Sequence, residues 1–209
     1  MAQQIDLERH IATLRECEIC PLMIRPVIVP RPILSKIYLI GQAPGPREGA
    51  FGRPFAWTAG KTLFRWFETI GLNEEQFRSL AYISAVCRCF PGKASGGGDR
   101  VPNPQEIKNC STWMQREFEI LDPDLIIPVG GLAISQIFGK VPLDSVIGKT
   151  SQREYFGRVR DIVPLPHPSG ASTWFKKEPG KTLLIDALQE LSCHQAWQNL
   201  RKSIQQNSF

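Results

Sequence analysis

The chain has 209 residues, of which 42% are hydrophobic and 22% are charged. This composition is that of an ordinary globular protein, and it excludes a disordered chain, a coiled coil and a collagen-like repeat. No apolar run approaches the roughly 18 residues that a membrane-spanning helix needs, and the first residues do not resemble a signal peptide. We therefore expect a single cytoplasmic domain that spans 1–209. The net charge of +5 and the pI of about 9.0 weakly favour an anionic partner such as nucleic acid.

Short apolar runs, typical of buried strands, alternate along the chain with stretches whose apolar residues recur with the period of a helix. The predicted core strands are, in chain order, 36–40, 81–86, 124–129 and 161–165. The predicted helices are 6–16, 61–70, 104–121, a short helix that ends at Phe138, and about 181–198. Residues 153–160 suggest one strand of a small hairpin. This alternation predicts an α/β fold: a three-layer α/β/α arrangement around a central, mainly parallel, four-stranded sheet.

The loops after the predicted strands are the expected place for a functional site. In open parallel sheets, ligands bind beyond the carboxyl ends of the strands. The loops that begin at Gly41, Cys87, Gly130 and His167 all lie there in this topology. Two of them have unusual composition, because 41–55 is rich in glycine and proline and 167–170 reads His-Pro-Ser-Gly.

Six cysteines need an explanation: Cys17, Cys20, Cys87, Cys89, Cys110 and Cys193. Structural disulfides are rare in cytoplasmic proteins, and one or two of these cysteines fit the alternative of small buried apolar residues. The Cys-x-x-Cys pair at 17 and 20 follows a polar helix and precedes a proline. This spacing favours metal or redox chemistry.

Four separate blocks of the sequence resemble motifs of the uracil-DNA glycosylase superfamily, in its iron–sulfur branch (families four and five). The first block reads Gly-Gln-Ala-Pro-Gly, Gly-Arg-Pro-Phe and Ala-Gly-Lys-Thr-Leu, and the last reads His-Pro-Ser. Two cysteine-containing blocks lie between them. The blocks are 41–45 with 52–55 and 59–63, then 88–92, 104–110 and 167–169. They occur in the family's order and cover most of the chain.

The resemblance implies a DNA repair glycosylase that extrudes uracil, and other deaminated bases, and hydrolyses the glycosidic bond to leave an abasic site. No lysine stands in a motif for Schiff-base chemistry, so we expect a monofunctional, monomeric enzyme associated with the nucleoid. Its partner would be DNA that contains uracil or another deaminated base. The alternative is a non-catalytic, metal-cluster nucleic-acid-binding module that keeps the fold, and a redox carrier is a more distant third.

The same resemblance implies a [4Fe–4S] cluster, for which thiolates are the usual ligands. The ligands carried over from the family are Cys17, Cys20, Cys89 and Cys110. Cys87 competes with Cys89 for the third place, and the Arg-Cys-Phe-Pro context favours Cys89. A zinc site with four cysteines is the alternative. We expect the metal site to hold loops together rather than to form the reaction centre.

The resemblance also implies a pocket for the extruded base. Phe55 is the candidate for stacking on the base, with a simple core position as the alternative. The backbone of Gly41, Gln42 and Ala43 would donate N–H groups to a base carbonyl. Ser84 and Ala85, at the end of the second strand, are expected beside the edge of the base.

His167 is the strongest candidate for a catalytic residue, although a lone histidine is more often a surface or core residue. A hydrogen bond from His167 would strengthen as negative charge develops on the departing base. Ser169 and Gly170 would bind a DNA phosphate. The run from Trp174 to Lys177 fits a wedge that fills the gap left by the base, and a buried aromatic pair beside solvated lysines is equally compatible. The DNA-contacting residues of this run would be Trp174, Lys176 and Lys177.

Two positions depart from the pattern of family four. Gln42 replaces an acid proposed to orient water, and glutamine can orient water but cannot take its proton. Ala85 replaces an asparagine that reads the edge of uracil. Both departures resemble family five, which accepts a wider set of deaminated bases. Glu48 is the nearest spare carboxylate and a candidate for catalysis, with a solvated loop charge as the alternative.

Overall fold

A mostly parallel sheet forms the centre of the molecule. The computed structural model describes residues 1–206, and its strands are β1 (Ile37–Gly41), β2 (Tyr82–Ala85), β3 (Leu125–Pro128), β4 (Ser151–Tyr155) and β5 (Arg158–Ile162). They are ordered β2-β1-β3-β5-β4, and only β4 runs antiparallel to its neighbour. Every residue of β1, β2 and β3 is buried, as expected for parallel strands that are covered on both faces.

The sheet has five strands, so the predicted number of four is wrong by one. The additional strand is β4, which pairs with β5 in a hairpin that turns at Phe156 and Gly157. Both turn residues have positive φ, as tight hairpins require. The interior of β4 is exposed, and its sequence Ser-Gln-Arg-Glu-Tyr contains no apolar run. An edge strand needs none. The sequence suggested a single hairpin strand at 153–160, and the structure places there most of β4, the turn and the start of β5. The predicted strand was 161–165, whereas β5 begins at Arg158 and ends at Ile162. Beyond β5, Leu165 pairs with Val129 only through an isolated parallel bridge.

Eight α-helices surround the sheet within the described residues. They are α1 (Ala2–Arg15), α2 (Glu48–Phe51), α3 (Thr58–Thr69), α4 (Glu74–Leu80), α5 (Pro104–Leu121), α6 (Gly131–Phe138), α7 (Gly180–Cys193) and α8 (Gln195–Gln206). Two short 3₁₀ helices are η1 (Leu143–Ser145) and η2 (Trp174–Lys176). The single helix predicted at 181–198 is two helices, because His194 has an extended backbone conformation between them.

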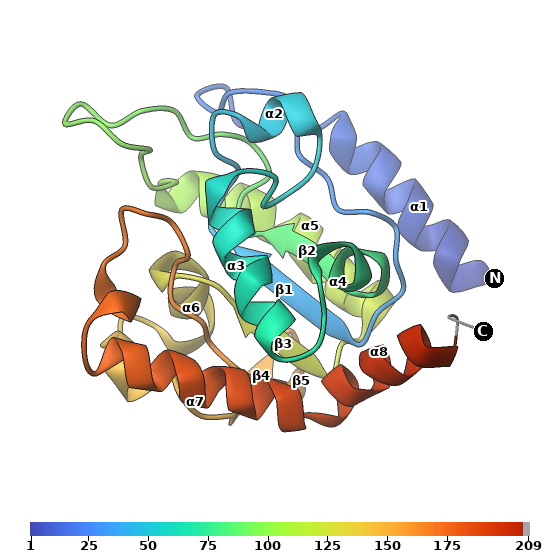
Figure 1. Ribbon diagram of the computed structural model, residues 1–209. Coiled ribbons are helices and arrows are strands. Elements are labelled where there is room, and N and C mark those ends of the chain that lie inside the picture. The colour runs from blue at the N-terminus through green and yellow to red at the C-terminus, as the bar shows by residue number, and fades with distance from the viewer. Residues whose placement is uncertain (207–209) are drawn as a thin grey trace.

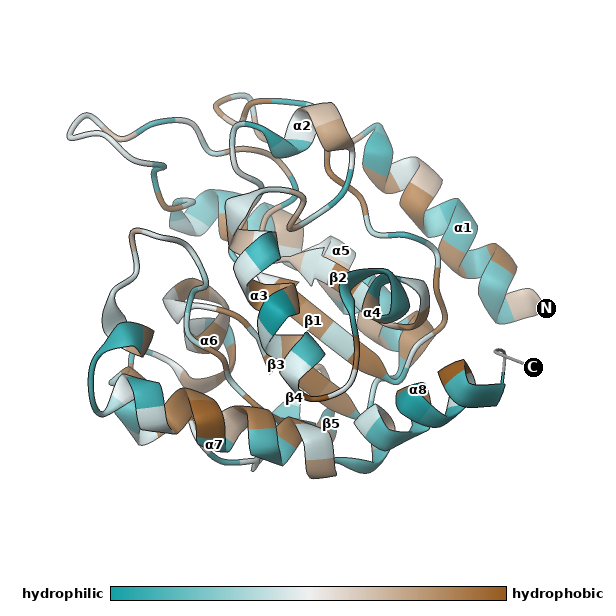
Figure 2. Cartoon of the chain, in the orientation of Figure 1, coloured by the Kyte–Doolittle hydropathy of each residue, from teal (hydrophilic) through white to brown (hydrophobic). Residues whose placement is uncertain are grey.

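The helices form two layers, so the predicted three-layer architecture is confirmed (Figure 1). Alternate residues of β1 point to opposite faces of the sheet. Ile37 and Leu39 belong to a core with α3, α4, α7 and α8, and Tyr38 and Ile40 belong to a second core with α1 and α5. Figure 2 shows the same separation of apolar and polar residues, with brown along β1 and alternating colours along α1 and α8.

Local sequence signals fix where several helices begin. Asn73 and Asn103 each accept a hydrogen bond from the backbone three residues ahead, and the side chains of Gln76 and Glu106 return the bond. Such reciprocal caps satisfy backbone groups that a helix start otherwise leaves unpaired. In residues 1–206, no helix is long and apolar enough to cross a membrane.

Candidate active site and thiol cavity

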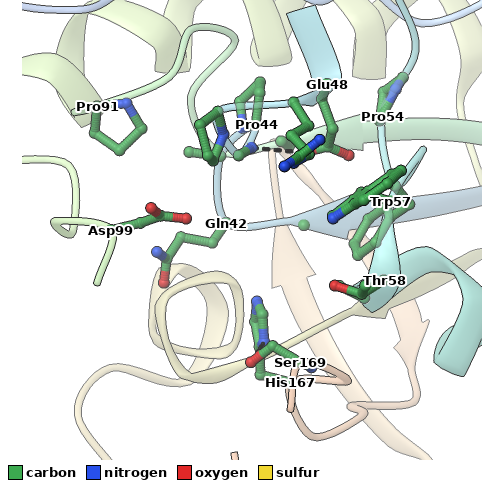
Figure 3. A pocket seen from close by; sticks show the side chains of 18 of the residues that line it. Gln42, Pro44, Glu48, Pro54, Trp57, Thr58, Pro91, Asp99, His167 and Ser169 are labelled. Carbon is green, nitrogen blue, oxygen red and sulfur yellow. Dashed lines mark hydrogen bonds between the residues drawn. The ribbon is translucent and has the colours of Figure 1, made fainter. Parts of the chain in front are cut away.

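A cavity of about 490 Å³ lies at the carboxyl ends of β1 and β2 (Figure 3). Most of its walls come from four segments of the sequence, parts of 41–48, 54–59, 91–99 and 167–171, and Ile28 and Ala85 complete the lining. The parallel sheet explains this convergence, because loops that follow neighbouring strands meet at one edge. The fold thus brings the first and last sequence blocks to one place.

His167 points into this cavity from the loop after the last core segment (Figure 3). Its Nδ1 accepts a hydrogen bond from the backbone N–H of Ser169 at 3.2 Å and lies 2.9 Å from the Ser169 hydroxyl. A neutral imidazole whose Nδ1 accepts a bond carries its proton on Nε2. Burial lowers the pKa of His167, so the ring is held neutral. Gly130 has a φ of 88°, and a Cβ there would lie 2.8 Å from the His167 ring, so only glycine permits this approach.

Phe55 lies against the end of β1 on another wall of the cavity. A Cβ on Gly41 would come within 2.7 Å of the Phe55 ring, so the glycine leaves room for the aromatic face. Phe55 has a φ of 54°, an unfavourable conformation for a bulky residue. The buried Arg78 of α4 stabilises it by donating hydrogen bonds to the carbonyls of Pro54 and Phe55, at 3.0 and 2.7 Å. Arg78 belongs to no recognised motif, so the sequence gave no signal for this role.

Glu48 lies at the cavity wall, but its carboxylate is engaged by the backbone. Oε2 accepts from the N–H of Gly45 at 2.6 Å, and Oε1 accepts from the N–H of Ala56 at 3.0 Å. Burial raises the pKa of Glu48, while these backbone hydrogen bonds act in the opposite direction. The side chain therefore joins the loop after β1 to the segment that leads into α3.

Most of the remaining predicted base-binding positions line the cavity: Gly41, Gln42, Ala43 and Ala85. Ser84 does not. It is fully buried in β2 and, by strand alternation, shares the face of Tyr82 toward α5. Neighbouring residues of a strand point to opposite faces, so Ser84 and Ala85 cannot both line the base cavity.

A small hairpin after β2 supplies two charged residues that the sequence analysis did not select. Lys93 and Asp99 both line the cavity, and Lys93 Nζ lies 2.6 Å from Asp99 Oδ1. Figure 3 shows Asp99 and Gln42 on the same side of the cavity. Asp99 follows three glycines and belongs to no recognised motif, so the sequence gave no signal for it.

Residues 31–192 match the family model described as "Uracil DNA glycosylase superfamily". The chain belongs to this superfamily. It is 33% identical over 166 residues to the type-4 uracil-DNA glycosylase of Saccharolobus solfataricus, which covers 75% of this chain and 73% of that protein. The corresponding type-4 enzyme of Archaeoglobus fulgidus is 29% identical over 169 residues, or 78% and 80% of the two chains.

The fold agrees with this membership. The crystal structure of wild-type Pedobacter heparinus SMUG2 superposes with a TM-score of 0.54 at 15% sequence identity, covering 93% of this chain and 98% of that chain. The resemblance expected from the sequence blocks is therefore confirmed, and the superfamily fold places the cavity beyond its parallel strands.

An aromatic and cationic rim borders the cavity in this member of the superfamily. It consists of Arg47, Phe51, Trp57 and Lys61. Trp57 is 39% exposed, and its ring stacks on Phe51 with centroids 5.8 Å apart. The cations of Arg47 and Lys61 lie over the Trp57 ring, at 4.8 and 5.7 Å from its centroid. The sequence carries no signal for this rim, because its residues become neighbours only when α2 and α3 are in place.

The predicted wedge occupies a different position. Trp174 is half-buried in η2, where a Cβ on Gly180 would collide with it. Phe175 packs edge-on against Trp66, with ring centroids 5.0 Å apart. The two aromatic side chains therefore match the alternative of a packed pair, while Lys176 and Lys177 are exposed. None of these residues lines the cavity, and Gly170 is also outside its lining, whereas Ser169 is part of it.

The four cysteines selected from the resemblance line a second, smaller cavity of about 130 Å³. Cys17 and Cys20 follow α1, Cys89 follows β2, and Cys110 lies in the second turn of α5. Cys87 is buried outside this lining, within hydrogen-bonding contact of Cys110, and Cys193 is exposed on α7.

The four thiols can serve as ligands to a bound metal group. Among residues 1–206, no three His, Cys, Asp or Glu side chains are close enough together to hold a single ion. Zinc would need four sulfurs at about 2.3 Å from one centre. Burial and the neighbouring thiolates raise the pKa of Cys89 to about 12, so a cationic group is needed to stabilise the ionised thiols here. Four thiols around one cavity are therefore a suitable set of ligands for an iron–sulfur cluster.

Proposed function

We propose that this protein is a uracil-DNA glycosylase, which hydrolyses the bond between the base and the deoxyribose and leaves an abasic site. The observation that carries the proposal is the meeting of His167, Phe55 and the loop 41–45 in one cavity. The type-4 uracil-DNA glycosylases that the chain resembles support the same activity.

The base would be extruded from the DNA stack into this cavity, because an enzyme cannot reach its glycosidic bond within a duplex. Phe55 would stack on the base, and the backbone N–H groups of Gln42 and Ala43 would donate to a base oxygen. The Nε2–H of His167 would donate to another oxygen of the base. Because negative charge accumulates on the departing base, these donors stabilise the transition state more than the ground state.

The base range would be wider than uracil alone. Ala85 offers no hydrogen bond to the edge of the base, and Ser84 lies away from the cavity. An apolar pocket discriminates weakly between related ligands, whereas one with buried polar partners rejects analogues strongly. Deaminated purines are therefore expected substrates, especially when mispaired, because a mispaired base is easier to extrude.

DNA would approach the rim of the cavity as a substrate of a monomeric, nucleoid-associated enzyme. Arg47 and Lys61 would contact phosphates, and Ser169 with the backbone at Gly170 would hold the phosphate nearest the extruded nucleotide. Lys176 and Lys177 would add long-range attraction. This agrees with the net charge of +5.

Cys17, Cys20, Cys89 and Cys110 would hold a [4Fe–4S] cluster. When bound, the cluster would supply a covalent cross-link between the segment after α1, the loop after β2 and α5. Pro91 lines the base cavity only two residues after Cys89. The cross-link would therefore fix one wall of the active site and take no direct part in hydrolysis.

The test uses oligonucleotides that carry one uracil, hypoxanthine or xanthine, incubated with the whole protein and then treated with alkali to cleave at abasic sites. Cleavage after alkali, without cleavage before it, is the expected result. Binding to the same oligonucleotides without release of any base would instead support the non-catalytic binding module.

A further inference from the structure

The cavity has two carboxylates, and only one of them is available for chemistry. Glu48 and Asp99 are the acidic residues in its lining. Both oxygens of Glu48 accept backbone hydrogen bonds, from Gly45 and Ala56, and these bonds hold the loop that carries the base site. Protonating or redirecting Glu48 would therefore disturb the loop itself.

Asp99 is held at the cavity by a hairpin with its own backbone structure. Lys93 and Asp99 form an antiparallel bridge, the N–H of Ala94 donates to the carbonyl of Gly98, and Gly97 and Gly98 make the turn with positive φ. A Cβ built on Gly45 would lie 3.8 Å from Asp99 Oδ2, so the carboxylate faces the loop 41–45. Gln42 lines the same cavity, and Figure 3 shows both side chains on one side of it.

An acidic side chain at this position works against DNA binding, since it repels phosphates at the place where the strand must approach. The neighbouring Lys93 reduces that repulsion through an ion pair of 2.6 Å, but it leaves Asp99 Oδ2 without a direct contact to the lysine. The Asp99 side chain is 40% exposed, so this second oxygen is open to water at the mouth of the cavity.

We propose that Asp99 is a catalytic residue that, together with the amide of Gln42, orients the attacking water and accepts its proton. The inference rests on the proposed glycosylase function. The bond between C1′ and the base nitrogen breaks, and its electron pair leaves with the base. The water oxygen then bonds to C1′, its proton passes to Asp99, and the base takes one proton from solvent. Gln42 orients the water but cannot take its proton. Gln42 and Asp99 together therefore perform the two tasks, orienting the water and accepting its proton, that a single carboxylate at position 42 could perform.

The test compares three variants in single-turnover cleavage of a uracil oligonucleotide at saturating protein. Asp99→Asn keeps the size of the side chain and removes the base, and the rate should fall about 10²-fold, the lower end of general-base effects, because a dissociative cleavage needs little from a base. DNA affinity should stay equal or increase, because a negative charge is lost. Asp99→Glu should recover part of the rate.

Lys93→Gln is the matched control, because it breaks the same ion pair and keeps the carboxylate. Its rate at saturation should stay within about threefold of wild type, since an exposed pair contributes little to loop stability. Equal losses in Lys93→Gln and Asp99→Asn would overturn the proposal, because they would assign Asp99 to loop structure alone. A fully active Asp99→Asn would overturn it as well. Wild-type protein that releases no uracil would instead refute the proposed function.

Discussion

At the scale of single residues, His167 shows how its surroundings define its chemistry. The neighbouring backbone N–H of Ser169 fixes Nδ1 as an acceptor, and burial lowers the pKa of the ring. Together they leave a neutral imidazole with its proton on Nε2, directed into the cavity. A neutral donor can hydrogen-bond a developing anion without the desolvation penalty of a buried cation.

His167→Ala should lower the single-turnover rate by about 10²–10³-fold, the usual effect of removing one donor to a developing charge. DNA affinity should change little, because the bond strengthens only in the transition state. Rapid-quench cleavage and a binding titration with the same oligonucleotide measure the two quantities. Near wild-type cleavage by the variant would show that backbone N–H groups stabilise the charge alone.

At the scale of elements, the rim built by α2 and the start of α3 is the exposed aromatic surface, whereas η2 packs against the body of the protein. Trp57→Ala should weaken binding to single-stranded DNA by about tenfold, because stacking contributes roughly 1–3 kcal/mol per base. Trp57→Phe should retain most of the affinity, since a phenyl ring still stacks.

Trp174→Ala serves as the comparison for that measurement. It should lower the melting temperature and leave DNA affinity nearly unchanged, because Trp174 packs where α7 begins. A larger loss of affinity in Trp174→Ala than in Trp57→Ala would restore the wedge interpretation of η2 and refute the rim as the stacking surface.

The thiol cavity joins three elements, and its occupant can be tested by composition and colour. Protein purified without oxygen should be brown and contain roughly four irons per chain. Cys17→Ser should lose the colour, because Cys17 lines the cavity, whereas Cys193→Ser should keep it, because Cys193 is exposed on α7. Stoichiometric zinc without visible absorbance would contradict the prediction.

At the scale of the whole molecule, a buried ion pair ties the sheet to the α1 and α5 layer. Arg88 lies 2.6 Å from Glu117 of α5, and neither side chain is exposed. Tyr38 of β1 donates a hydrogen bond to the same carboxylate, and His10 of α1 lies 3.6 Å from it. Burial alone would raise the pKa of Glu117, but the charge of Arg88 and the contacts with His10 and Tyr38 hold this pKa below its ordinary value.

Glu117→Ala should lower the free energy of unfolding by about 3–5 kcal/mol, because it leaves the Arg88 charge buried without a partner. Glu119→Ala, on the same helix, removes a half-exposed partner of Arg116 and should change stability by less than about 1 kcal/mol. Urea unfolding of both variants makes the comparison. Similar small effects in both would show that water or local rearrangement compensates Arg88.

The sequence by itself determined the features that depend on neighbours in the chain. Apolar runs located the core strands, helical spacing located most of the long helices, and the order of short blocks identified the superfamily. The cysteine context also selected the four thiols that line one cavity, and set Cys87 aside. These signals can be recognised without a structure because each depends on a few residues that are close together in the sequence.

Only the tertiary structure decided the features that depend on what distant segments place side by side. The polar edge strand β4 carries no apolar pattern, Glu48 is engaged by amides that folding brings to it, and Trp57, not Trp174, is the exposed tryptophan of the two. Asp99 became a candidate only when a glycine-rich hairpin carried it to the loop after β1. Burial, pairing and the direction of a side chain depend on packing, and packing is decided by residues that are far apart in the sequence.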